Sequence, residues 1–102
     1  GHAAGDQLLW QAARRMQALA EAKRQLAQTQ EQIAAQQKER SQLPPVMNAL
    51  ERTGQAYKTY ERKLLAIEER LEALQKERDE RTAKVNELEQ SLAEYVNGLN
   101  VE

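Results

Sequence analysis

A seven-residue repeat of apolar side chains runs through the second half of the chain and constrains its fold more than any other feature. Position d begins at Val46, position a begins at Leu50, and the repeat continues for seven heptads to Leu99. Position a holds Leu50, Tyr57, Leu64, Leu71, Arg78, Val85, Leu92 and Leu99, and position d holds Val46, Thr53, Tyr60, Ile67, Leu74, Arg81, Leu88 and Tyr95. A strict period of seven over this length predicts a long helix with the left-handed supercoil of a coiled coil.

The first half of the chain is also helix-forming, with a wider and less regular apolar stripe. With Met16 at position a, position d holds Ala12, Leu19, Leu26, Ile33 and Arg40. Position a holds Leu9 and Met16 and then turns polar, whereas position e is an unbroken row of alanines at Ala13, Ala20, Ala27 and Ala34. Small side chains let another helix approach closely, so the pattern predicts that this helix touches more than one neighbour.

Two adjacent prolines, Pro44 and Pro45, separate the two halves. A residue that precedes proline is disfavoured in the α-helical region, and each proline removes a backbone N–H donor. We therefore expect a turn at residues 42–45 that folds one helix back on the other, in preference to a kink in one long rod. The expected order is a tag remnant and disordered start at 1–5, a helix at 6–41, the turn, a helix at 46–97 and a tail at 98–102.

The predicted fold is all-α: a two-helix antiparallel coiled-coil hairpin with a longer second helix, assembling into a dimeric helical bundle. Folding at residue 43 or 44 places Ile33 between Thr53 and Tyr57 and leaves the second helix without a partner from about residue 83. A three-helix bundle, with a break near Arg78 and Thr82, is the alternative. Against that break, Glu–Lys and Glu–Arg pairs four residues apart support continuous helix over the same stretch.

Composition excludes several classes of function. The chain has 102 residues, a formal net charge of -1, no cysteine and no phenylalanine. A neutral chain lacks the basic face that sequence-independent nucleic-acid binding requires, so no nucleic-acid partner is expected. No apolar stretch reaches the length of a membrane span, so we expect no membrane insertion of this segment.

Nothing in the sequence predicts catalysis, a metal or a cofactor. His2 is the single histidine, which removes Ser-His and Cys-His nucleophilic sites. Glu68, Glu69 and Glu72 could be considered as a cation site, but carboxylates on an exposed helix face do not close a coordination shell. Tyr57 and Tyr60 lie at core positions and are expected to pack in the coiled coil rather than stack on nucleobases.

An exposed, heptad-patterned overhang predicts self-association, most simply as a dimer. The residues assigned to it are Val85, Leu88, Leu92, Tyr95 and Leu99 of the second helix, with Ala13, Ala20, Ala27 and Ala34 of the first. In a parallel dimer Lys63 would face Glu68, and Lys84 would face Glu89, of the other chain; the orientation is otherwise open. The turn residues Leu43, Val46 and Met47 have two interpretations, as a cap on the hairpin core or as a docking tip for another protein.

The function expected from these features is a non-catalytic coiled-coil module for self-association or scaffolding within a larger bacterial protein. The chain opens with Gly-His, as an excised segment behind a cleaved tag would. On that basis we favour an envelope, secretion or division assembly, with this segment as the periplasmic or cell-envelope part of a membrane-anchored protein and a cytoplasmic location as the alternative. The rival hypothesis is a spacer in a nucleoid-associated or condensin-like protein.

Overall fold

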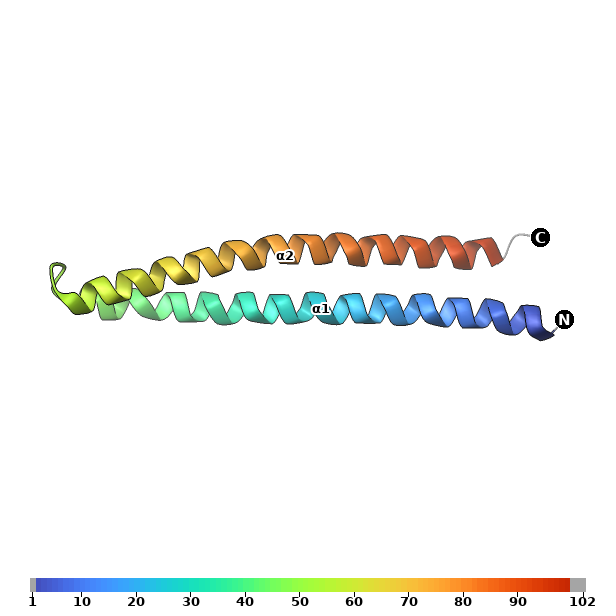
Figure 1. Ribbon diagram of the computed structural model, residues 1–102, viewed down its shortest axis with the longest axis horizontal. Coiled ribbons are helices and arrows are strands. Elements are labelled where there is room, and N and C mark those ends of the chain that lie inside the picture. Colours follow the sequence, from blue (N-terminus) through green and yellow to red (C-terminus); the bar gives the residue numbers. More distant parts are fainter. Residues whose placement is uncertain (1, 100–102) are drawn as a thin grey trace. The chain divides into compact units, whose positions relative to one another are not determined.

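Two helices of similar length form an antiparallel hairpin (Figure 1). The structure is a computed structural model that describes residues 2–99, with side chains from residue 4 onward. Helix α1 spans His2–Asn48, and helix α2 spans Gln55–Leu99. The predicted all-α antiparallel hairpin is therefore confirmed, whereas the longer second helix is wrong, since α1 has 47 residues and α2 has 45.

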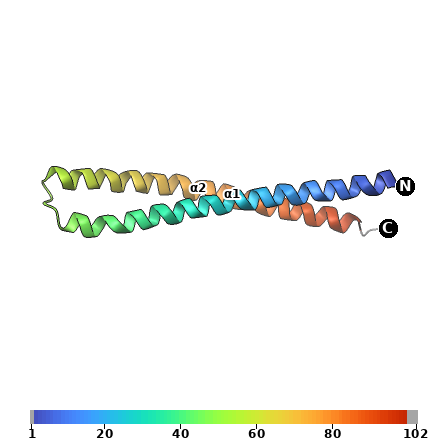
Figure 2. The ribbon, with the colours of Figure 1, turned by 90° about the horizontal axis from the view of Figure 1, so that it is seen from below.

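The turn lies later in the chain than predicted. Helix α1 continues through Pro44 and Pro45, and residues 49–54 make the connection seen in Figure 2. The predicted turn at 42–45 is therefore wrong, as is the kinked single rod. Helix α1 also begins at His2, so the disordered start is wrong for residues 2–5, and residue 1 lies outside the described residues. Residues 98 and 99 belong to α2 rather than to a tail, and residues 100–102 also lie outside the described residues.

Burial on either side of the prolines explains why the helix continues. Leu43 and Met47 are one helical turn apart and both are buried in the hydrophobic core. Burying two such side chains contributes about 3–6 kcal/mol, which is comparable with a cost of about 3 kcal/mol for each proline inside a helix. The prolines lie on the exposed side. The carbonyls of Arg40 and Ser41, which lose their N–H partners, belong to exposed residues that water can reach.

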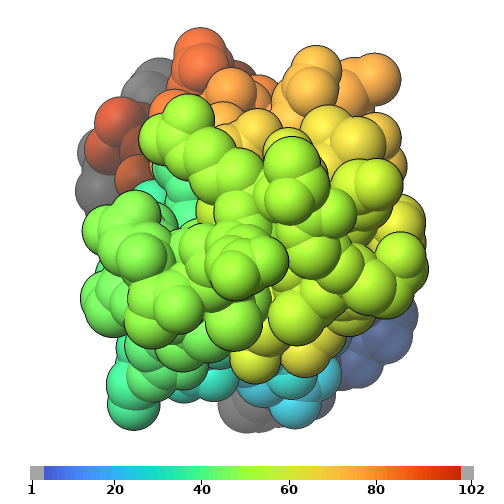
Figure 3. Space-filling view, turned by 90° about the vertical axis from the view of Figure 1, so that its left-hand side faces the viewer, coloured from blue at the N-terminus to red at the C-terminus, as the bar shows by residue number. Residues whose placement is uncertain are grey.

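The connection is closed by short-range backbone hydrogen bonds. The N–H of Ala49 donates to Val46 O at 3.1 Å, and the N–H of Leu50 donates to Met47 O at 3.0 Å. Gly54 O accepts the first bond of α2, from the N–H of Lys58 at 3.3 Å, which makes Gly54 the N-cap. A Cβ at Gly54 would lie 3.2 Å from the carbonyl oxygen of Glu51, so glycine suits this tight approach. Figure 3 views the molecule from this end, with the residues around the connection in green.

The chain forms two compact units, each with its own seam between α1 and α2. The terminal unit is Gly1–Ala27 with Asp79–Glu102, and the turn unit is Gln28–Arg78. The core of the turn unit comprises Ile33, Leu43, Met47, Ile67, Leu71 and Leu74, with Tyr57, Tyr60 and Leu64 packed against it. In the terminal unit Ala22 and Val85 are buried, and Leu19, Leu26, Leu88 and Leu92 are half-buried. The buried side chains of the terminal unit are therefore smaller than those of the turn unit.

The predicted heptad of α2 is confirmed. For α1, position d is largely confirmed and position a is wrong. Every predicted a and d residue of α2 from Tyr57 to Tyr95 is buried or half-buried. On α1 the predicted d residues from Ala12 to Ile33 face the seam, whereas Arg40 is exposed. The second row of seam residues on α1 comprises Arg15, Ala22, Thr29, Gln36 and Leu43. The predicted a residues Leu9 and Met16 are exposed. Helix α2 is continuous through Arg78 and Thr82, so the three-helix alternative is wrong.

We expect Pro45→Ala to raise the free energy of unfolding by about 1–2 kcal/mol, measured by urea denaturation. Alanine restores an N–H donor for the carbonyl of Ser41 and removes the clash of the ring with that turn. The gain is reduced because proline also restricts the unfolded chain. Pro44→Ala should act in the same direction. A loss of stability in both variants would place the prolines outside the helix.

Candidate interaction surface

The two most exposed large apolar side chains of α1 lie on a face that α2 does not cover. Leu9 is 71% exposed and Met16 is 59% exposed, and Ala13 and Ala20 are also exposed. The spacing of these four residues places them along one side of α1 within the terminal unit. We call Leu9, Ala13, Met16 and Ala20 the outer stripe.

A shallow apolar groove adjoins the outer stripe. It is lined by Met16, Leu19, Ala20, Lys23 and Leu92. Both helices of the terminal unit therefore contribute to the same side of the molecule. Further large apolar side chains in this unit are exposed in part, at Leu8, Trp10, Val96 and Leu99. Exposed apolar side chains next to an apolar groove, as Met16 and Ala20 are here, are typical of an interaction surface.

Charged and aromatic contacts join the two helices of the terminal unit beside this surface. Lys23 Nζ lies 3.7 Å from Glu89 Oε1, and both side chains are about half exposed. The guanidinium of Arg15 lies over the ring of Tyr95, 4.3 Å from its centroid, and the Tyr95 hydroxyl donates to Leu8 O at 3.0 Å. The exposed Lys23–Glu89 pair contributes about 0.2–1 kcal/mol, and the contact between the half-buried Arg15 and Tyr95 contributes about 0.5–2 kcal/mol.

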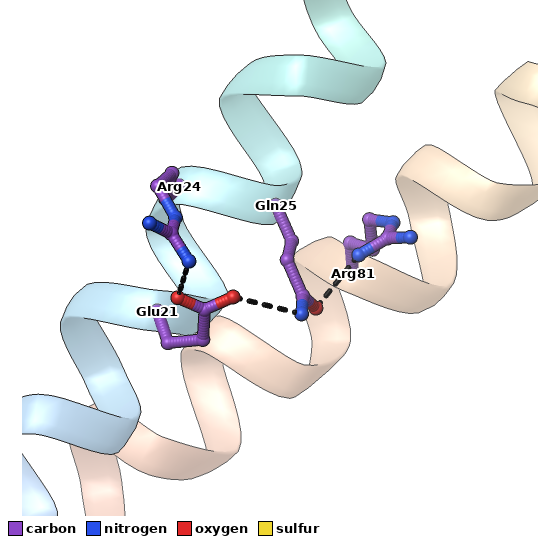
Figure 4. A network of polar contacts seen from close by, with 4 residues as sticks. All are labelled: Glu21, Arg24, Gln25 and Arg81. Carbon is purple, nitrogen blue, oxygen red and sulfur yellow. Dashed lines mark hydrogen bonds and ion pairs between the residues drawn. The ribbon is translucent and has the colours of Figure 1, made fainter.

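A polar network occupies the seam where the sequence places Arg81 (Figure 4). Arg81 Nη1 donates to Gln25 Oε1 at 2.7 Å, and Gln25 Nε2 donates to Glu21 Oε1 at 3.1 Å. Arg24 donates to the other carboxylate oxygen of Glu21. The guanidinium thus reaches a polar chain at the edge of the seam while its stem stays half-buried. This explains how a strict heptad tolerates arginine at a core position.

The predicted overhang of α2 does not exist. Val85 is buried, Leu88, Leu92 and Tyr95 are half-buried against α1, and Leu99 is exposed. Moving the turn to residues 49–54 brings the start of α1 opposite the end of α2, as the Tyr95–Leu8 hydrogen bond shows. The overhang therefore gives no reason to assign these five residues to a dimer interface. By contrast, the predicted alanines Ala13, Ala20, Ala27 and Ala34 are all exposed.

The charge pairs invoked for a parallel dimer are engaged within the chain. Glu68 accepts a hydrogen bond from Arg40 at 3.1 Å, and Glu89 lies beside Lys23. Lys84 lies 3.8 Å from Glu87, one turn along α2. These intrachain contacts compete with the pairs of a parallel dimer, so the charge pattern of α2 does not favour a parallel arrangement.

The predicted docking tip is mostly core. Leu43 is 6% exposed and Met47 is 8% exposed, and both belong to the core of the turn unit. Val46 is 40% exposed, so it is the one residue of the three that another molecule can reach in this conformation. The structure thus places Leu43 and Met47 as the interpretation of a hairpin cap requires.

The described residues hold no site with an evident chemistry. No group of three or more His, Cys, Asp or Glu side chains among them could hold a metal ion. Within the same residues, neither helix has a stretch long and apolar enough to cross a bilayer. Tyr57 and Tyr60 pack against the core of the turn unit, as predicted.

Sequence reasoning missed the outer stripe because it assigned Leu9 and Met16 to the seam with the other helix. The signal was present in the sequence. Both residues, at position a, lie on the helix surface next to the alanines at position e, a row whose role as a second contact face stays a prediction. Leu65 of α2, which is 57% exposed, was not singled out either.

Comparison with protein-family models, with curated proteins and with solved structures finds no match to this chain.

We expect Leu43→Ala to lower the free energy of unfolding by about 2–4 kcal/mol, because it opens a cavity in the core of the turn unit. The matched change Val46→Ala removes a side chain that is already partly in water and should cost less than about 1 kcal/mol. Urea denaturation of both variants measures the difference. Equal losses would contradict the burial of Leu43 and revive the docking tip.

Proposed function

We propose that this chain is a non-catalytic helical module that self-associates and thereby joins copies of a larger protein. The observation that carries the proposal is the outer stripe. A hairpin whose seam is already closed exposes Leu9 and Met16 on a separate face, beside an apolar groove. In water such a face favours association with another apolar surface.

The direction of the outer stripe supports a helical bundle. Successive residues of a helix differ by about 100° around its axis. Residues of the outer stripe directly follow seam residues in the sequence, so the outer stripe lies about 100° around α1 from the seam with α2. A helix with two apolar faces at nearly a right angle has the pattern of a four-helix bundle, in which each helix packs on two neighbours. Two hairpins meeting through this face supply the four helices.

The size of the outer stripe indicates modest affinity. Burying Leu9 and Met16 in each of two copies contributes on the order of 6–12 kcal/mol. Association itself costs on the order of 4–15 kcal/mol in lost freedom of motion, which offsets much of that gain. Leu92 and the two alanines add contact area at the edge. The most favourable difference between these two ranges is about 8 kcal/mol, which corresponds to a dissociation constant of about 1 μM. We therefore expect a reversible dimer whose dissociation constant is micromolar or weaker.

Scaffolding within a bacterial envelope, secretion or division assembly remains a prediction from the sequence. No contact among the described residues bears on the compartment. The outer stripe supports the association step alone.

We expect the chain to sediment at about twice its 11.7 kDa mass at a concentration of about 100 μM. Leu9→Ser with Met16→Ser should convert it to a monomer, because both changes remove apolar area from the contact. Helix content should stay unchanged, since neither side chain is buried in the hairpin. Sedimentation equilibrium and circular dichroism measure the two properties.

Leu65→Ser is the matched control. Leu65 is as exposed as Met16 but lies in the turn unit, so its loss should leave the dimer intact. A wild-type chain that stays at its monomer mass at that concentration would overturn the proposal.

A further inference from the structure

We propose that a second copy occupies the outer stripe in an antiparallel orientation, with α1 of one copy against α1 of the other. The twofold axis passes between Arg14 and Arg15. This inference rests on the proposed self-association and adds its geometry. Two independent features of the terminal unit lead to it, namely the sizes of the side chains in the outer stripe and the charges at its two ends.

The side chains of the outer stripe are self-complementary in size. With the twofold axis between residues 14 and 15, a residue that precedes the axis in one copy faces the residue equally far after the axis in the other copy. Leu9 then faces the partner's Ala20, and Met16 faces the partner's Ala13. Each large side chain meets a small one, which lets the two helices approach closely and interdigitate.

The charges at the two ends of the outer stripe are complementary under the same axis. Asp6 continues the stripe one turn before Leu9, and Lys23 continues it one turn after Ala20; both side chains are exposed. The antiparallel axis places Asp6 opposite the partner's Lys23, and the symmetry repeats this pair at the other end. Opposite charges at the rim of an interface fix its register and exclude other arrangements.

A parallel arrangement of the same faces would be unfavourable. Each residue would then face its own copy, so Asp6 would meet the partner's Asp6 and Lys23 would meet the partner's Lys23. Met16 and Leu9 would also face their own copies, which leaves the alanines opposite each other with little to fill the space. The antiparallel arrangement avoids both problems.

Lys23 can serve the second copy while it keeps its contact inside the chain. Its ammonium group has three N–H donors, and its contact with Glu89 is a long one at 3.7 Å. About half of the side chain remains exposed in the hairpin. An exposed carboxylate from a second copy therefore finds a lysine that α2 already holds beside the apolar groove.

Distances between spin labels test the orientation. The chain has no cysteine, so Gln17→Cys and Arg24→Cys each give a single labelling site. Both positions are exposed, lie one heptad apart and point in the same direction from α1. In the antiparallel dimer the two labels at residue 17 are offset by about 8 Å along the helix axis, and those at residue 24 by about 28 Å. Double electron–electron resonance should therefore give a distance at residue 24 that exceeds the one at residue 17 by about 15 Å or more.

A parallel dimer would give the same distance at both positions. That result, in a sample that sediments as a dimer, would overturn the antiparallel inference and leave self-association standing. A chain that stays monomeric would remove both.

Charge reversal tests the rim pairs. Asp6→Lys places two lysines opposite each other at both ends and should weaken the dimer about ten-fold. The double variant Asp6→Lys with Lys23→Glu restores opposite signs and should recover most of the affinity. Glu94→Lys, an equal charge change on an exposed side chain of α2 in the same unit, is the control and should have little effect. Equal weakening in the single and the double variant would overturn the pairing of Asp6 with Lys23.

Discussion

The hairpin depends on the packing of Leu43 and Met47 against α2, on either side of two prolines. Local backbone preferences favour ending the helix before Pro44, and burial of these two side chains favours continuing it. The helix continues to Asn48, and the register of the hairpin follows from that outcome. A turn at residues 49–54 rather than 42–45 slides α1 along α2, so that Arg40 reaches Glu68 and Leu8 reaches Tyr95. The overhang disappears, and the end of α2 is covered from within the chain.

The two units differ in how much apolar side chain they bury between α1 and α2. The turn unit holds a continuous core of large apolar side chains, with Leu74 fully buried. The terminal unit buries only Ala22 and Val85 and leaves its seam leucines half-buried, and it adds the Arg81–Gln25 hydrogen bond and the stacking of Arg15 on Tyr95. Exposed polar contacts of this kind contribute little stability compared with buried apolar area. The terminal unit is thus the part of the hairpin that gains most from an added partner.

The sequence alone predicts α2 well and α1 only in part, and the reason is physical. Rows a and d of α2 carry large side chains from Tyr57 to Tyr95, so only one phase buries them. On α1 two phases compete, because Leu9 and Met16 are more apolar than Arg15 and Ala22. Geometry decides between them, since only one face of α1 can meet α2 once the turn is placed. The turn itself was misplaced because prolines are strong local signals, whereas the opposing signal was the unbroken spacing of Leu43, Met47 and Leu50.

The same competition explains why α1 carries a second apolar face. A helix that only had to pack on α2 would need no large side chain at Leu9 or Met16, and exposing them carries a cost in solubility. The seam meanwhile accepts Arg15, Thr29 and Gln36, side chains that a tightly packed two-helix core would exclude. Apolar residues are therefore absent from part of the available seam and present on a face that the hairpin leaves open. Binding at the outer stripe and packing at the seam with α2 are coupled by mass action. A partner that binds the outer stripe only when the terminal unit is folded also stabilises that unit against fraying.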